Sequence, residues 1–347
     1  MQSLFSTLLH LPFRPRLLAG MVFFALIFTA ITSDALAAES QIMPLAEKSL
    51  LLDGQVIDDK IIIVGERGHI LTSVDHGVSW QQQQVPTRST LTSIFFVDAT
   101  NGWAAGHDSV ILRTRDGGQH WQEIYADPED ERPILDLWFQ DINHGYAVGA
   151  YGLFLATADG GESWEPLDFD PATLLAEDTA AEESWGIDFH LNHITVTAAG
   201  QTFISAEAGN LYRSDDGCRS WLSLPSPYEG SFYGSLPLTQ SSLLAFGLRG
   251  NLFRSEDAGS QWTEIVSGVL ATLNDGIRLD DGRIVLAGLA GTLLISDDGG
   301  KNFVQHPQAD RAGIAKVLQA RDGALILIGE HGVKRLQLPN QAKEAGQ

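Results

Sequence analysis

A repeat of about 41 residues runs through most of this chain and constrains its fold more than any other feature. Gly-x-x-Gly turns, or close variants of them, end at residues 68, 109, 152, 209, 250, 291 and 332, at intervals of 41, 43, 57, 41, 41 and 41. A period near this length, built from short strands, is typical of β-propellers, in which each period forms one four-stranded blade. The sequence therefore predicts an all-β fold, a seven-bladed β-propeller.

Six of the seven repeats continue into a second motif, the Asp-box, which reads Ser/Thr-x-Asp-x-Gly-x-x-Trp or a close variant. Its acids are Asp75, Asp116, Asp159, Asp216, Asp257 and Asp298. The hydroxyl and the carboxylate can both accept backbone N–H groups in a tight turn, and the glycine permits positive φ. We interpret these aspartates as structural, and the aromatic residue as a wedge between blades. Cys218 replaces the glycine of the fourth box, which we interpret as a tolerated variant.

Apolar alternation within each repeat predicts four strands. In the second repeat they fall at 91–97, 102–106, 110–114 and 120–125. The last repeat ends after a strand at 333–338 and lacks both the box and a fourth strand. Residues 41–47 precede the first blade, so we expect them to supply the missing strand and to close the ring, which would remove its exposed edges.

The first residues have the features of a targeting segment. Arg14 and Arg16 precede an apolar run at 17–32, and the alanines at 35–38 provide a small-residue cleavage site. We predict a signal peptide at 1–37 and a single exported propeller at 38–347, in the periplasm or an equivalent extracytoplasmic compartment. A retained membrane anchor is the alternative, although the run is short for a spanning helix.

Charge and residue types limit the classes of function. Lys and Arg number 22 against 44 Asp and Glu, a net charge of -22, which disfavours nucleic acid as a partner. Basic proteins, neutral sugars and cations remain open. His190 and His193 are three apart in a predicted strand, so their side chains face opposite sides and make a poor metal pair. No catalytic constellation is evident, and we expect neither a metal nor another cofactor.

The order of strands places the connecting loops on two opposite faces. Asp-boxes join third to fourth strands on one face, and the Gly-x-x-Gly hairpins join second to third strands on the other, together with the linkers between blades. The longest interval holds an acidic insertion at about 165–184 in such a linker, which is either a solvated loop or a binding loop. We expect partner binding on the hairpin face, by Arg67, His107, Tyr151, Arg249 and His331.

Two repeats share a longer motif, Phe-x-Asp-x-x-x-Gly-Trp/Tyr-x-x-Gly, which begins at Phe96 and Phe139 and leads into an Asp-box. This combination resembles the photosystem II stability/assembly factor family. The resemblance implies an exported, non-enzymatic scaffold that binds intermediates of membrane proteins, in oxygenic phototrophs a photosystem II reaction-centre precursor. It also implies an arginine-rich patch, for which Arg67 and Arg249 are the candidates at hairpin tips.

We accordingly expect a monomer whose partner is an envelope or membrane protein client. The alternative is an Asp-box glycoside hydrolase of the sialidase type, because sialidases share the box. Their fold has six blades, and their activity requires an arginine triad with an early Phe-Arg-Ile-Pro-type motif. The start of the mature chain, near Glu39–Pro44, contains no arginine.

Overall fold

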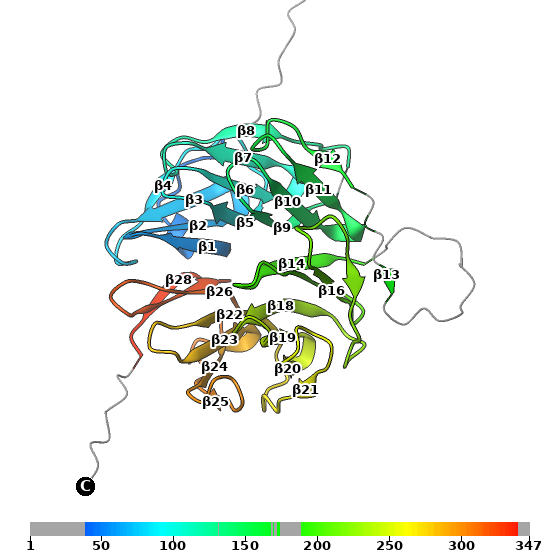
Figure 1. Ribbon diagram of the computed structural model, residues 1–347. Coiled ribbons are helices and arrows are strands. Elements are labelled where there is room, and N and C mark those ends of the chain that lie inside the picture. The colour runs from blue at the N-terminus through cyan, green and yellow to red at the C-terminus, as the bar shows by residue number, and fades with distance from the viewer. Residues whose placement is uncertain (1–38, 131, 168, 170–171, 174–188, 339–347) are drawn as a thin grey trace, which may run out of the picture. The chain divides into compact units, whose positions relative to one another are not determined.

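Figure 1 shows the computed structural model, which describes residues 39–130, 132–167, 169, 172–173 and 189–338. The signal peptide predicted at 1–37 lies outside the described residues. So do Asp168, Asp170, Glu177, Asp178, Glu182 and Glu183 of the acidic insertion. Within the described part of the chain, no helix combines the length and the apolar character needed to cross a membrane.

The first four sheets are antiparallel meanders along the chain. Blade 1 contains β1 (Leu51–Ile57), β2 (Lys60–Gly65), β3 (His69–Ser73) and β4 (Gln81–Gln83). Blade 2 contains β5 (Leu91–Phe96), β6 (Gly102–Gly106), β7 (Ile111–Thr114) and β8 (Gln122–Tyr125). Blade 3 contains β9 (Ile134–Phe139), β10 (Gly145–Gly149), β11 (Phe154–Thr157) and β12 (Glu165–Pro166). Blade 4 contains β14 (Leu191–Val196), β15 (Thr202–Ala206), β16 (Leu211–Ser214) and β17 (Leu222–Ser223).

The remaining three sheets follow the same order. Blade 5 contains β18 (Phe232–Pro237), β19 (Leu243–Gly247), β20 (Leu252–Ser255) and β21 (Thr263–Glu264). Blade 6 contains β22 (Leu273–Arg278), β23 (Ile284–Gly288), β24 (Thr292–Ser296) and β25 (Val304–Gln305). Blade 7 contains β26 (Ile314–Gln319), β27 (Leu325–Gly329) and β28 (Gly332–Leu336). The strand boundaries predicted for the second repeat are correct to within two residues.

The seven sheets form a closed ring (Figure 1). The first strand of each sheet contacts the first strand of the next, and β1 contacts β26. The strands β1, β5, β9, β14, β18, β22 and β26 therefore surround the central axis, and the later strands of each sheet lie progressively further out. The prediction of an all-β, seven-bladed propeller is confirmed.

Apolar clusters between neighbouring blades hold the ring together. Trp121 of blade 2 packs in one cluster with Ile62 and Val64 of blade 1. Trp164 of blade 3 packs with Trp103 of blade 2, and both indoles are less than 10% exposed. Burial of a large apolar side chain contributes about 1.5–3 kcal/mol. The box tryptophans therefore act as the predicted wedges, each against the preceding blade.

The predicted closing strand at 41–47 is wrong for the described residues. Blade 7 has three strands there, and the segment ends in one turn of 3-10 helix, η1 (Ala46–Lys48), which contacts β28. The preceding residues instead follow the outer edge of blade 1, where the Ser40 amide donates to the Val85 carbonyl at 2.8 Å. Pro44 lies between these two stretches and has no amide hydrogen for a ladder, which explains why the segment turns instead of continuing as a strand.

Packing between the first and last blades closes the ring instead. Ile61 and Ile63 of β2 share an apolar cluster with Ile326 and Ile328 of β27, and Ala46 of η1 joins the same cluster. All four isoleucines are almost fully buried. The seam thus resembles the other blade interfaces in its chemistry, although no strand among the described residues is shared across it.

The described residues of the acidic insertion lie at the outer edges of blades 3 and 4, beginning with Glu165–Pro166 in β12 of blade 3. Phe169 is buried between blades 3 and 4, where its ring meets Phe154 at 5.4 Å and Tyr212 at 4.9 Å. Residues Ala172–Thr173 form β13, which pairs in parallel with β17 as a fifth, outermost strand. The start of the insertion therefore extends the outer edge of a blade. The expectation that the insertion overhangs the hairpin face concerns mainly residues 174–184, which lie outside the described residues.

Candidate functional site

The Asp-box turns use both of their polar side chains for internal hydrogen bonds. In the first box the Ser73 hydroxyl accepts the Gly77 amide at 2.9 Å and donates to Asp75 Oδ1 at 2.8 Å. Asp75 Oδ1 also accepts the Ser79 amide at 2.9 Å. The corresponding three bonds recur in the other five boxes. The structural interpretation of the box is thus supported by every copy.

These bonds also decide what the box acids can do chemically. Hydrogen bonds from the side chain and then the backbone of a serine four residues on hold the pKa of Asp75, Asp159 and Asp216 at about 2. A carboxylate with such a pKa is ionised at neutral pH and has no proton to donate. These three acids are therefore unsuited to the general-acid role that glycoside hydrolysis requires.

Cys218 occupies a glycine position of the box at φ 65° and is 4% exposed. Its amide donates to the Ser214 hydroxyl at 2.9 Å, so the turn keeps its geometry. Burial raises the pKa of the Cys218 thiol to about 11. The thiolate that a reactive cysteine needs is therefore scarce at neutral pH.

The Gly-x-x-Gly hairpins on the opposite face are held by backbone atoms. In all seven repeats the second residue of the turn donates its amide to a carbonyl just before the first strand of the same blade, at 2.9–3.1 Å. The first glycine permits this approach, because a Cβ at Gly247 would lie 2.1 Å from the Ser231 carbonyl oxygen. The fourth residue commonly bonds to the linker toward the next blade, as the Gly68 amide does to the Ser89 carbonyl.

The third residue of each hairpin forms the tip. Among the described residues no tip side chain bonds within its own turn by a hydrogen bond, although Asp108 accepts one from the Ser89 hydroxyl of the neighbouring linker. Its φ is positive in the first six repeats, at 57° for Arg67, 58° for Asp108, 50° for Tyr151 and 58° for Arg249. Positive φ favours glycine, aspartate or asparagine, yet the tips hold Arg, Asp, Tyr, Ala, Arg and Ala in chain order. The turn thus fixes the position of the tip and leaves its side chain free to vary.

The structure places the five predicted partner-binding residues on the hairpin face, one to a blade. All five are exposed, and Tyr151 has 58% of its surface accessible. No interaction among the described residues joins two of these five side chains. Tyr151 instead meets His190 edge to face at 5.0 Å, and Arg67 lies 4.0 Å from its neighbour Glu66. They therefore form a ring of separate contact points rather than one pocket.

His190 and His193 lie in different environments, although His190 precedes β14 and is not part of a strand as predicted. His190 contacts Tyr151 on the hairpin face, whereas His193 lies in the central strand β14, with its Nε2 atom 3.8 Å from Asp136. In the part of the chain that the structure describes, no group of three or more His, Cys, Asp or Glu side chains is placed to hold a metal ion.

Six polar residues and one glycine near the axis form a set that the sequence did not lead us to predict. They occupy the equivalent register position of the seven inner strands, just after the bulge, and we call them the axial belt: Asp53, Ser93, Asp136, His193, Gly234, Asp275 and Lys316. The sequence does contain a signal for this set. In several inner strands a charged residue follows two places after the first apolar residue, as in Leu51–Asp53 and Leu273–Asp275.

The three aspartates of the axial belt each bind the next blade. Asp53 Oδ2 accepts the Ile94 amide at 2.8 Å, and Asp136 Oδ2 accepts the Ile194 amide at 2.8 Å. Asp275 Oδ2 accepts the Val317 amide at 2.9 Å. Each carboxylate also has a side-chain partner within the belt. The belt therefore fastens blades together and offers no free acid or base.

Lys316 is the cation of the axial belt, with Nζ 3.1 Å from Asp53 Oδ1 and 3.6 Å from Asp275 Oδ1. Burial alone would lower the pKa of Lys316, but the charges of Asp275, Asp53 and Asp136 outweigh it and hold this pKa above its ordinary value. The side chain is 24% exposed and borders a cavity of about 360 Å³, which Gln55 and Gln319 also line. The ammonium thus stays charged at the centre of the ring.

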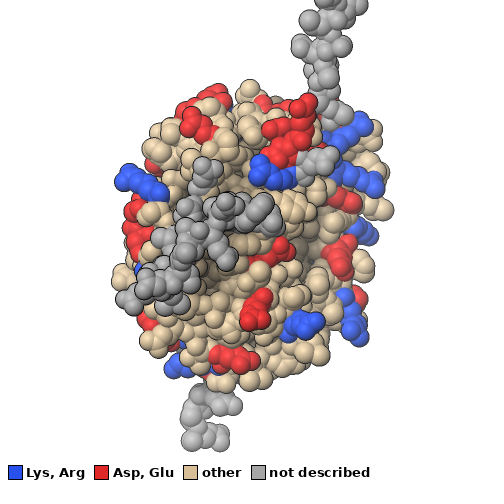
Figure 2. Space-filling model, turned by 90° about the vertical axis from the view of Figure 1, so that its right-hand side faces the viewer, with Lys and Arg blue, Asp and Glu red and all other residues tan. Residues whose placement is uncertain are grey.

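Charged side chains of both signs are scattered over the side of the molecule in Figure 2. Lys and Arg side chains lie among Asp and Glu side chains there, separated by uncharged surface. This side of the molecule therefore does not present an electrostatic field of a single sign. Selection of a partner would depend on individual positions rather than on net charge.

Comparison with known proteins identifies relatives of this chain. The family model for "Photosynthesis system II assembly factor YCF48" matches residues 72–134 and 127–287, which together span more than half of the chain. This stretch includes the Asp-boxes of blades 1 to 5 and the longer motif at Phe96 and Phe139.

Individual curated relatives match over shorter segments. The chain is similar to "Photosystem II assembly protein Ycf48" of Synechococcus sp. (strain JA-2-3B'a(2-13)), with 47% identity over 47 residues, 13% of this chain and 14% of that protein. It is similar to "Photosystem II stability/assembly factor HCF136, chloroplastic" of Cyanidioschyzon merolae (strain NIES-3377 / 10D), with 36% identity over 67 residues, 18% of this chain and 15% of that protein. The matched segments thus span about one seventh of the relatives' length.

A solved structure extends the likeness to the fold. The structure described as "YCF48 bound to D1 peptide" superposes with a TM-score of 0.66 at 20% identity, covering 84% of this chain and 94% of that chain. At this identity the superposition shows a shared fold. Together with the match of the family model over both motifs of the repeat, it leads to one assignment: the chain belongs to the photosystem II assembly factor YCF48 family.

Proposed function

We propose that this protein is a non-enzymatic scaffold that binds a membrane or envelope protein client through its hairpin face. The observation that carries the proposal is the difference between turn and tip: backbone bonds hold each hairpin, so the side chains of the tips are available to a partner. Loop positions set on a rigid scaffold are where binding residues concentrate. The predicted partner-binding residues Arg67, His107, Tyr151, Arg249 and His331 are exposed on this face.

The class of client follows from the family. A structure of the same fold is described as YCF48 bound to D1 peptide, which supports an extended segment of a membrane protein as the client here. The signal peptide predicted at 1–37 supports action outside the cytoplasm, in the periplasm or an equivalent compartment. A monomeric propeller with one client segment across its hairpin face is the simplest form of this complex.

Charge reversal at two tips tests the proposal. The full chain with Arg67→Glu and Arg249→Glu is compared with the wild type for capture of client proteins from the membranes of its own source, with the captured proteins identified by mass spectrometry. We expect loss of the client with no decrease in melting temperature, because neither guanidinium holds the turn. Unchanged capture would place the client elsewhere on the propeller.

A matched control lies on the opposite face. Arg115 and Arg219 are exposed arginines of the Asp-box face, so Arg115→Glu with Arg219→Glu changes the net charge by the same amount. We expect this variant to capture the client normally. Equal losses in both variants would mean that net charge, and not the hairpin face, governs binding.

A further inference from the structure

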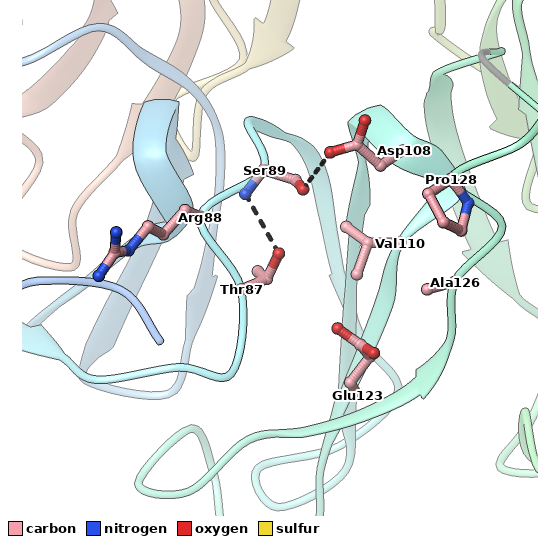
Figure 3. A pocket seen from close by; sticks show the side chains of 8 residues that line it. All are labelled: Thr87, Arg88, Ser89, Asp108, Val110, Glu123, Ala126 and Pro128. Atoms are coloured by element: carbon pink, nitrogen blue, oxygen red, sulfur yellow. Dashed lines mark hydrogen bonds between the residues drawn. The ribbon is translucent and has the colours of Figure 1, made fainter. Parts of the chain in front are cut away.

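The hairpin face of blade 2 contains a pocket that differs from the other tips in its charge. It has a volume of about 410 Å³ and lies between the linker that precedes blade 2 and the linker that follows it (Figure 3). Its lining residues are Thr87, Arg88, Ser89, Asp108, Val110, Glu123, Ala126 and Pro128. Asp108 is the hairpin tip itself, at the position where blades 1 and 5 carry arginine.

Two carboxylates stand at opposite ends of this pocket. Asp108 lies at one end, where it accepts a hydrogen bond from the Ser89 hydroxyl, and Glu123 of β8 lies at the other end with its carboxylate directed toward the space between them (Figure 3). Burial raises the pKa of Glu123. Among the described residues, neither carboxylate has a Lys, Arg or His partner within ion-pair distance.

The one basic residue of the lining does not compensate them. The Arg88 side chain points away from Glu123 and Asp108 in Figure 3, and its Nε donates to the Glu39 carbonyl at 2.8 Å. The two carboxylates therefore share a partly enclosed space that no cation of the described chain fills. An exogenous cation entering there would meet less screening than at an open surface.

Apolar groups line the path between the two carboxylates. Ala126 and Pro128 are exposed and form one wall of the pocket, and the buried Val110 forms its floor between Asp108 and Glu123 (Figure 3). A lysine or arginine side chain joins an aliphatic stem to a charged end, and it buries the stem along apolar surface while the charge seeks a counter-ion. The shape and chemistry of the pocket correspond to such a side chain.

We propose that this pocket, hereafter the blade 2 acidic pocket, receives a basic side chain of the protein partner. The stem lies along Ala126 and Pro128, and the ammonium or guanidinium binds Glu123 with Asp108 as the second counter-charge. The inference rests on the proposed client binding at the hairpin face and specifies its chemistry: the client presents a lysine or arginine to blade 2. An acidic group of the same client would then face the arginine tips of blades 1 and 5.

Small probes test the pocket without knowledge of the client. The ¹⁵N-labelled full chain is titrated with N-acetyl-lysine amide and, separately, with N-acetyl-norleucine amide, while the backbone amides of Val110, Glu123 and Ala126 are followed by NMR. We expect saturable shifts with the lysine probe that weaken as NaCl is raised. Equal shifts from the uncharged norleucine probe, or none from lysine, would overturn the proposal.

Variants at equivalent positions of the repeat distinguish binding in the pocket from an effect of the protein's net charge. Glu123→Gln keeps the size of the side chain. It should lower the affinity for the lysine probe about tenfold, as expected for loss of a charge-assisted hydrogen bond. Glu264→Gln is the matched control, because Glu264 holds the same repeat position in blade 5 and is exposed. Equal weakening by both variants would attribute the effect to net charge. The melting temperatures of both variants should match the wild type.

Client capture then distinguishes this inference from the proposed function. If Glu123→Gln lowers capture of the client that the Arg67 and Arg249 reversals also lose, both proposals stand. If capture survives Glu123→Gln but not the arginine reversals, the pocket is wrong and the hairpin face remains the binding face. If the lysine probe binds the pocket while neither set of variants affects capture, the pocket is real and the client binds elsewhere.

Discussion

The Asp-box turns and the Gly-x-x-Gly hairpins occupy opposite faces of the same ring and recur with nearly constant geometry. They reach that constancy by different means. A box turn depends on the hydroxyl and carboxylate of its own side chains, as Ser73 and Asp75 show. A hairpin depends on backbone amides and on a glycine that lets two strands approach, as at Gly247.

This difference determines where function can vary without loss of the fold. Replacing a box residue removes a bond of the scaffold, so the box face has little freedom to specialise. The hairpin tips place a different side chain at the same point of each blade, from Arg67 to Asp108 to Tyr151. A partner would therefore be selected by the sequence of tips around the ring.

Acidification should produce the largest difference between the two faces, because it should weaken the Asp-box turns and leave the hairpins unchanged. Asp75, Asp159 and Asp216 have pKa values of about 2 in the folded state, below the ordinary value of 3.8. Their contribution to stability is therefore complete above about pH 4 and is lost as the pH falls through 2. We expect the melting temperature, followed by tryptophan fluorescence, to fall steeply across this window. Backbone bonds of the hairpins do not titrate there.

The control for acidification is Asp159→Asn, which removes one titrating group from the box face. Its melting temperature should be lower than that of the wild type at pH 6 and should depend less on pH between 4 and 2. A flat profile in the wild type over the same window would show that the box carboxylates do not stabilise the fold through their charged form.

Gly247→Ala should cause a large loss of stability in the hairpin of blade 5. The new Cβ would lie 2.1 Å from the Ser231 carbonyl oxygen, so the blade must shift, and we expect a loss of about 3 kcal/mol in denaturant unfolding. Blade 4 provides the control, because Ala206 holds the equivalent position. Ala206→Gly should change stability by about 1 kcal/mol or less. Similar small effects at both positions would show that the close approach is not required.

Ser255→Ala should cost somewhat less and should act on the box face. The Ser255 hydroxyl is 1% exposed, accepts the Gly259 amide at 2.8 Å and donates to Asp257 Oδ1 at 2.9 Å. Its removal leaves a buried amide without its acceptor, so we expect a loss of about 2 kcal/mol. Ser260→Ala, at an exposed position of the same turn, should change stability by less than about 0.5 kcal/mol. Equal losses of stability in Ser255→Ala and Ser260→Ala would show that the buried hydroxyl is not what stabilises the box turn.

The smallest effect is expected at a hairpin tip. Ala290 adopts φ 55°, a conformation that asparagine tolerates better than alanine. Ala290→Asn should therefore raise the free energy of unfolding by about 0.5 kcal/mol. A clear loss of stability would indicate that the tip packs against its surroundings, and that the hairpin face is less free to vary than the geometry implies.

The repeat allowed most of the fold to be predicted because its signals are local. Turn glycines, box residues and alternating apolar residues each act within one blade, so their spacing translates directly into strands and faces. The prediction was wrong at 41–47, where the outcome depended on which of two distant blade edges the segment meets. Such long-range choices leave no periodic mark in the sequence.

The candidate site was only partly accessible for the same reason. Exposed tips such as Arg67 and Arg249 could be named from the turn alone. The blade 2 acidic pocket could not, because it forms only where the linkers before and after blade 2 fold beside Asp108 and Glu123. The axial belt also escaped notice, since Asp53 and Lys316 meet only when the ring closes.

The way in which the ring closes has a mechanical consequence. At the seam between blades 1 and 7, side-chain packing and the segment that runs from Glu39 to η1 resist separation, and no strand of the described chain is shared. A tensile load applied at Glu39 would act first on the bonds of this segment along the edge of blade 1, one after another, before it reached any inner strand. Under force the propeller should therefore yield first by peeling at this edge, with the blades themselves intact.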